Sequence, residues 1–292
     1  MVSHAHGQGF ADSHFIIPET IDSIDFKKGP YTASKGDFAT TGFVDFNTKK
    51  HLQNNLIKLE GGMFNTYRAL AMFDLLKPGA ALKQQSFYAA AEYRYAAAYF
   101  DNPQHFKRFN LFVKYNGKVF LNSVLTLSAT TFWRKRDASG QIPKRAVDNG
   151  IIGFYGAIDP FEGGLTYRTN ANAQLTTSFT NGDIVKNQLY YSNSSFDLHT
   201  NFTFFLVDMI NGDEIRQKEQ RSLVGYNGSY HHTSYHGSIK LLSDVGVNLR
   251  ADLTGNSALS HTIDRFTTLA QIKLGNISQL DIDPHIIETI TF

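Results

Sequence analysis

Hydrophobic and polar residues alternate with a period of two along most of the chain. Successive side chains of a β-strand point to opposite faces, so this alternation predicts strands with one apolar and one polar face. Residues 238–253 give the clearest case, because Val245, Val247 and Leu249 fall on one face and Asn248 falls on the other. The pattern favours an all-β protein.

Ten such runs follow one another as a simple antiparallel, up-and-down meander. They span residues 55–64, 67–77, 86–98, 107–116, 119–133, 173–181, 187–207, 222–233, 238–253 and 265–275. The run 86–98 has enough alanine to permit a helix as well, and the last residues up to Phe292 are strand-like but unassigned. A soluble β-sandwich also alternates, usually in shorter strands.

The connections between the expected strands alternate in length. Those after the second, fourth, sixth and eighth runs have about 2–8 residues, and those after the third, fifth, seventh and ninth have from about 8 to nearly 40. Only Asn65-Thr66, after the first run, breaks this rule. Short turns at one rim and long loops at the other are typical of outer-membrane barrels. Aromatic residues near strand ends are expected in the interface girdles, with ordinary core packing as the alternative. These are Tyr67, Tyr99, Phe100, Tyr115, Trp133 and Tyr226.

Composition narrows the function classes. The 292 residues carry a net charge of +2, which gives no basic footprint for nucleic acid. The chain has no cysteine, which excludes a disulfide scaffold and a cysteine-ligated metal site. No apolar run approaches the roughly 18 residues that a membrane helix needs, whereas a membrane strand needs only about 9–11.

No catalytic signature stands out. The chain lacks a G-x-S-x-G elbow, an H-E-x-x-H motif, a P-loop and a G-x-G-x-x-G motif. Isolated acidic and histidine residues are better explained as polar loop residues than as a carboxylate pair or a metal site. They are His4, His6, His14, Asp148, Asp159, Glu162, His231, His232 and His236. The sequence therefore predicts no enzyme, no cofactor and no metal site.

Residues 21–48 carry a more specific signal. Two alternating runs, 21–27 and 42–48, flank a connection rich in Gly, Pro, Ser and Asp, and Asp25 stands shortly before a Lys-Gly-Pro motif. This order resembles the end of the plug domain of TonB-dependent outer-membrane receptors. The matching motif residues are Lys28, Gly29, Pro30, Gly36 and Gly42. The segments 6–12, 17–19, 138–143, 145–147 and 158–164 resemble a subset of the same family.

The resemblance implies two parts, the C-terminal end of a plug with its linker in residues 1–50 and the N-terminal part of a β-barrel in residues 51–292. Such a piece makes a partial, unclosed barrel, with the plug remnant against its concave polar face. Lys28 is expected to face carboxylates of the barrel wall, and the motif glycines to serve tight turns. Residues 1–4 have no signal-peptide character, so the resemblance also implies an internal piece of a longer protein.

The implied function is active transport across the outer membrane of a Gram-negative bacterium. Its partners are outer-membrane lipid, a small-molecule or oligosaccharide ligand, and the TonB energy-transducing complex, through a segment missing here. The ligand is an iron chelate, haem, cobalamin or an oligosaccharide, and the sequence does not select among them. Ligand-contact candidates lie in the connection 134–172: Arg134, Arg136, Arg145, Tyr155, Phe161 and Tyr167. The alternatives are a passive porin-like barrel and a secreted β-rich carbohydrate-binding or hydrolytic domain.

Overall fold

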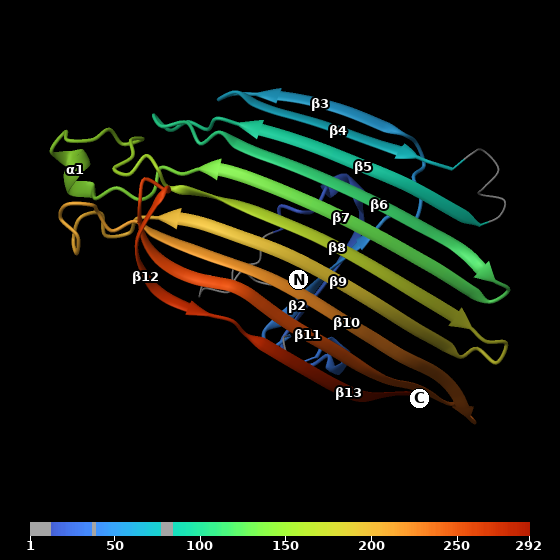
Figure 1. The fold of residues 1–292 in the computed structure, drawn as a ribbon. Helices are drawn as coiled ribbons and strands as arrows, with labels where there is room; N and C mark the ends of the chain where they lie inside the picture. Colours follow the sequence, from blue (N-terminus) through green and yellow to red (C-terminus); the bar gives the residue numbers. More distant parts are fainter. Residues whose placement is uncertain (1–12, 37–38, 77–83) are drawn as a thin grey trace.

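The computed structural model describes residues 13–36, 39–76 and 84–292 (Figure 1). His4, His6 and the segment 6–12 lie outside these ranges. No helix among the described residues is long and apolar enough to cross a membrane.

One large antiparallel sheet dominates the structure. Its strands are β3 (Leu56–Gly62), β4 (Thr66–Asp74), β5 (Gln85–Ala96), β6 (Phe106–Phe120), β7 (Ser123–Asp137), β8 (Gly163–Ser178), β9 (Ile184–Thr200), β10 (Ile215–His236), β11 (Ile239–Ile263), β12 (Thr267–Gly275) and β13 (Ser278–Thr291). Each strand pairs with its neighbours in sequence order, from β3 at one edge to β11. Both β12 and β13 pair with β11, at different ends of it, so together they occupy the tenth position of the meander. The sheet stays open, which confirms the predicted fold class of a partial meander.

A second, two-stranded sheet precedes the large one. It pairs β1 (Ile21–Lys28) with β2 (Gly42–Thr48), and two short 3₁₀ helices flank β1, η1 (Pro18–Thr20) and η2 (Ala33–Lys35). The only α-helix in the described part of the chain is α1 (Lys144–Asp148), in the connection between β7 and β8. Residues 13–36 and 39–50 lie on one face of the large sheet, which we call the inner face; the opposite face is the outer face (Figure 1).

The register of the sheet separates apolar from polar side chains. One continuous cross-strand row, the outer row, runs from β5 to β13 through Phe87, Tyr115, Leu127, Ala173, Leu189, Tyr226, Leu249 and Ile282. The adjacent row, the inner row, runs through Ser86, Asn116, Thr126, Gln174, Gln188, Asn227, Asn248 and Asp283. Every member of the first row is apolar or aromatic, and every member of the second is polar. In its middle, the sheet therefore has an apolar outer face and a polar inner face.

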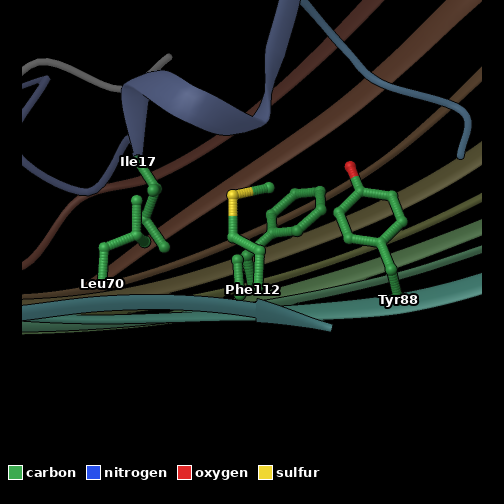
Figure 2. Close-up of a cluster of buried hydrophobic side chains, with 6 residues drawn as sticks. Ile17, Leu70, Tyr88 and Phe112 are labelled. Atoms are coloured by element: carbon green, nitrogen blue, oxygen red, sulfur yellow. The ribbon is translucent and has the colours of Figure 1, made fainter. Parts of the chain in front are cut away.

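A small hydrophobic cluster fixes residues 13–50 on the inner face. Ile17, which precedes η1, is 2% exposed and packs against a group of buried side chains on β4, β5 and β6 (Figure 2). These are Leu70, Met72, Tyr88, Ala90 and Phe112, with Leu52 of the linker packed against them. Because apolar side chains here break the polar pattern of the inner face, the N-terminal segment covers the part of that face that water would solvate poorly.

Several expected boundaries are wrong, and each error has a local cause. The turn between β6 and β7 lies at Leu121-Asn122 instead of residues 117–118, because Gly117 pairs with Gln85 and Leu125 inside the ladder. The connection expected at 134–172 is reduced to 138–162, because β7 and β8 continue as paired strands at both of its ends.

Two later boundaries also differ, one strand being shorter and one longer than expected. The run expected at 187–207 ends at Thr200, and β11 continues ten residues beyond its expected end, to a tight turn at 264–266. Residues 278–291, unassigned in the sequence, form β13. The run 86–98, which also permitted a helix, is the strand β5.

Candidate functional site

An ion-pair cluster joins the N-terminal segment to the inner face. Glu19 of η1 accepts two hydrogen bonds from the Arg68 guanidinium, from Nη1 at 2.8 Å and from Nη2 at 2.6 Å. Arg68 Nε donates to Glu92 at 2.6 Å, and Arg108 Nη2 donates to the other oxygen of Glu92, also at 2.6 Å. Glu92 is fully buried, so the two arginines compensate a charge that burial would otherwise penalise strongly. Hydrogen bonding from Arg68 holds the pKa of Glu19 at about 2.

Three inner-face side chains hold the linker that follows β2. Lys114 Nζ donates to the carbonyl of Thr48 at 2.9 Å, and the Tyr88 hydroxyl donates to the carbonyl of Lys49 at 2.9 Å. Ser86 Oγ donates to the next carbonyl, that of Lys50, at 2.5 Å. Backbone acceptors need a partner when they leave water, and here the sheet supplies one for three successive residues.

Another part of the N-terminal segment contacts the inner face near the other edge of the sheet, at β11 and β13. Asn248 of β11 donates to the carbonyl of Ser34 in η2 at 3.1 Å. Gly36 has φ +70°, and a Cβ at this position would lie 2.7 Å from Asp283 Oδ2 of β13. A side chain here would therefore meet both backbone strain and a clash. The N-terminal segment therefore crosses the inner face from β4 to β13.

The predicted plug-motif residues lie in β1, in β2 and in the connection between them. Gly29 and Gly42 also have positive φ, and a Cβ on Gly42 would lie 2.3 Å from the carbonyl oxygen of Lys27. Lys28 is exposed at the end of β1 and Pro30 follows in an exposed turn. Within residues 13–36, 39–76 and 84–292, no ion pair joins Lys28 to the sheet; the pairing there is made by Glu19 and Arg68. The ion pair of Glu19 with Arg68 is a separate contact, and the role expected of Lys28 stays a prediction.

The long connections at one rim pack together into a loop layer, made of residues 97–105, 138–162, 201–214 and 264–266. The amide of Asp101 donates to the carbonyl of Tyr155 at 3.1 Å, and Asn201 Nδ2 donates to Asp159 Oδ2 at 3.0 Å. Arg265 joins two of the connections to the end of β7, since its side chain donates to Asp137 Oδ1 at 2.8 Å and to the carbonyls of Phe161 and Glu162.

Two buried carboxyl groups lie inside the loop layer. Glu214 Oε1 accepts from Thr262 Oγ1 at 2.6 Å and from the amide of Arg265 at 3.1 Å. Glu162 is 4% exposed, and burial raises its pKa to about 7, with Asp159 and Glu214 adding a repulsive charge. Among the described residues, neither Glu162 Oε1 nor Glu214 Oε2 has a hydrogen-bond partner.

In the connection 201–214, one carboxylate accepts several hydrogen bonds, and the exposed side chains are mostly apolar. The Asp213 carboxylate accepts from Thr203 Oγ1 and from the amides of Leu206, Val207 and Asp208, at distances of 2.7–3.2 Å. The side chains that this loop exposes are mostly hydrophobic. They are Phe202, Phe205, Leu206, Val207, Met209 and Ile210.

The structure divides the predicted ligand-contact residues. Arg134 and Arg136 share a face of β7, and Arg134 contacts His14 and Thr166, which places both arginines on the inner face beneath the loop layer. Phe161 is part of the loop layer, and Arg145 is exposed on α1. Tyr167 is separated from them, because its register partner is Trp133 on the outer face.

Tyr155 belongs to an aromatic group that the sequence does not reveal. Its ring lies 5.3 Å from that of Tyr99 and 5.1 Å from that of Phe154, and the Tyr99 and Phe100 rings stack at 4.5 Å. Tyr99 and Phe100 therefore pack in the loop layer, away from the girdle expected for them. Arg265 and Glu19 are also absent from the sequence candidates, since their partners lie 39 or more residues away.

The histidines noted near the opposite rim do not converge. His231 pairs with Asp244 at 3.3 Å, and His232 pairs with Asp183 at 2.7 Å on the other face of β10. In the part of the chain that the structure describes, no group of three or more potential ligands could hold a metal ion.

Comparison with solved structures identifies the fold. No protein-family model and no curated protein matches the sequence. The unliganded ferric citrate transporter FecA superposes with a TM-score of 0.73 at 11% identity over 93% of this chain. The ferripyoverdine receptor of the outer membrane of Pseudomonas aeruginosa gives 0.65 at 13% over 83%, and the copper transporter OprC gives 0.64 at 16% over 93%.

The match covers less than half of each of these proteins. This chain spans 41% of the ferric citrate transporter, 33% of the ferripyoverdine receptor and 40% of the copper transporter. The order of elements agrees with the resemblance drawn from the motif residues, a small sheet followed by a meander that carries it on the inner face. The chain has the fold of part of a TonB-dependent outer-membrane receptor.

Proposed function

We propose that the chain is part of an outer-membrane active transporter that binds a scarce ligand and imports it with energy from the TonB complex. Residues 1–50 form the end of its plug and residues 51–292 the first part of its barrel wall. The observation that carries this proposal is the attachment of residues 13–50 to the polar face of a sheet whose other face is apolar. A passive porin has no need of such an attached segment, and a secreted domain would turn its apolar face inward.

The dimensions of the outer face support a membrane position. An aromatic row crosses β5 to β8 near the loop layer, through Tyr93, Phe109, Trp133 and Tyr167. Ten residues separate Trp133 from the start of β7 at Ser123, which is about 33 Å along the strand and about 25 Å in height at a tilt of about 40°. An apolar band of about 25 Å with aromatic residues at its border is what an outer-membrane barrel presents.

The loop layer and the arginines below it are the proposed ligand site. Arg134 and Arg136 offer charged hydrogen-bond donors, and the group of Tyr99, Phe154 and Tyr155 offers exposed aromatic faces. Guanidinium and aromatic groups suit an anionic, conjugated chelate. The matching structures are a ferric citrate transporter, a ferripyoverdine receptor and a copper transporter, so a metal chelate is the ligand class to test first.

The test is direct binding to the full 292-residue chain in detergent, with ferric citrate, haem and cyanocobalamin as probes. We expect one probe to bind and the Arg134→Ala/Arg136→Ala variant to bind it at least tenfold more weakly. Lys144→Ala, at an exposed position of α1 in the same layer, is the matched control. Equal binding by all three proteins would place the ligand elsewhere and contradict the proposed site.

A further inference from the structure

A groove lies on the outer face where β6, β7, β8 and β9 meet. Its volume is about 530 Å³, within the range of small-molecule pockets. Most of its lining consists of outer-face side chains, and three of these are alanines in the centre of the sheet: Ala129, Ala171 and Ala173. The groove is therefore continuous with the outer row, which shares Phe87, Tyr115, Leu127, Ala173 and Leu189 with it.

The groove results from the cross-strand pairing of small residues among large ones. Ala129 of β7 is the register partner of Ala171 of β8, and Ala173 lies between Leu127 and Leu189. Tyr191 closes the side toward β10, opposite Ala171. Large side chains thus stand around a floor that has only methyl groups.

Polar side chains border the groove on the side of the loop layer. Two residues beyond the alanine pair, Thr131 Oγ1 lies 3.2 Å from Thr169 Oγ1. In the same cross-strand row, Asn193 Nδ2 donates to Ser222 Oγ at 3.0 Å. The row beyond contains Trp133, so these groups lie between the aromatic border and the apolar groove.

We propose that this groove binds one acyl chain of a bilayer lipid from the leaflet next to the loop layer, with the lipid ester group at the Thr131 and Asn193 row. The proposal rests on the proposed function, because an acyl chain reaches the outer face only in a membrane. Three features support this occupant: an apolar floor, a polar border at one end and continuity with the membrane-facing row. Ala129 is four residues from Trp133, about 13 Å along the strand and about 10 Å deeper in the proposed apolar band.

The experiment counts lipids that stay with the protein. The full chain is folded into vesicles of phosphatidylethanolamine and phosphatidylglycerol, extracted in a mild detergent and weighed by native mass spectrometry. We expect one phospholipid per chain with the natural sequence and none with Ala129→Leu/Ala171→Leu, which fills the groove. Ala69→Leu, on the outer face of β4 and outside the groove, is the matched control and should retain the lipid.

Quenching of Trp133 by brominated lipids in the same vesicles separates this inference from the proposed function. If Trp133 is quenched in all three proteins and their lipid counts are equal, the groove is not a lipid site although the outer face lies in the membrane. A natural chain that retains no lipid, or that is recovered as a dimer through this face, would overturn the inference as well. If Trp133 is not quenched at all, the proposed function fails first.

Discussion

Glu19 and Arg68 are 49 residues apart in the sequence and join the N-terminal segment to the sheet through two hydrogen bonds of 2.6 and 2.8 Å. Arg68 is held in place by Glu92, which is buried and also paired with Arg108. The inner face of the sheet therefore presents a preformed binding site, two arginines and one glutamate, for one acidic side chain of the N-terminal segment.

Replacing that acidic side chain should release the segment. We expect Glu19→Gln to weaken its attachment by about 1.5–3 kcal/mol, the usual contribution of hydrogen bonds to a charged group. The measurement is the rate of trypsin cleavage after Lys27 and Lys28, which should rise at least tenfold. Lys58→Gln is the control, because Lys58 pairs with the same carboxylate at 3.3 Å but is exposed, so its loss should change the cleavage rate little. Equal cleavage rates in both variants would show that the ion pair does not hold the segment.

The stability of the Glu19–Arg68 contact should depend on pH. Hydrogen bonding from Arg68 lowers the pKa of Glu19 from 4.5 to about 2, so its stabilising effect is complete above pH 4.5 and is lost as the pH falls toward 2. Trypsin does not act at these pH values, so pepsin is the suitable probe. We expect faster cleavage of residues 13–50 as the pH drops from 4.5 to 2 and a flatter profile for Glu19→Gln.

Gly36 should be intolerant of a side chain. Gly36→Ala places a methyl group 2.7 Å from Asp283 Oδ2 and keeps φ at +70°, so a loss of about 1–3 kcal/mol is expected. Urea unfolding in detergent measures the change in the free energy of unfolding. Gly61→Ala is the control, since no atom lies within 4 Å of its added Cβ and its φ is not positive. A variant as stable as Gly61→Ala would mean that Gly36 does not approach β13.

The loop layer should loosen as the pH rises through neutrality. Burial raises the pKa of Glu162 above its ordinary value of 4.5 to about 7, so the neutral form is the one that the folded layer favours. Stability from this group is complete below pH 4.5 and is lost as the pH passes about 7. Hydrogen exchange of residues 138–162 should therefore quicken between pH 6 and 8, after correction for the intrinsic rate. Glu162→Gln should remove this dependence; a profile unchanged by the substitution would contradict it.

Asp213 should determine the shape of the loop 201–214. Asp213→Ala leaves the amides of Leu206, Val207 and Asp208 without their acceptor, so their hydrogen exchange should accelerate by an order of magnitude or more. Asp148→Ala is the control, because Asp148 forms only an exposed pair with Lys144. Unchanged exchange at 206–208 would show that the carboxylate does not organise the loop.

The sequence predicts the strands well where apolar and polar positions alternate strictly. In β11, Val247 and Leu249 face outward while Asn248 contacts the N-terminal segment, as the alternation requires. The prediction fails where local composition and pairing disagree. Gly117 looks like a turn residue, yet it lies within the ladder of β6, and the polar ends of β7 and β8 look irregular although they pair in full.

The candidate site is less visible in the sequence, because it depends on contacts between distant segments. The pairing of Glu19 with Arg68, and the contact of Arg265 with Asp137, 128 residues away, have no local signature. Tyr167 stands in the expected segment, but strand parity turns it to the outer face. Parity is predictable only once the strand boundaries are known, and these were the least certain part of the pattern.

The position of Trp133 tests the account most directly. It is the only tryptophan in the sequence and its register places it on the outer face, between Phe109 and Tyr167. In vesicles of phosphatidylcholine brominated along the acyl chain, we expect its fluorescence to be quenched most strongly by bromines near the ester end, in accordance with a place at the border of the apolar band. Fluorescence that is insensitive to brominated lipid but quenched by aqueous iodide would contradict the claim that this face contacts hydrocarbon.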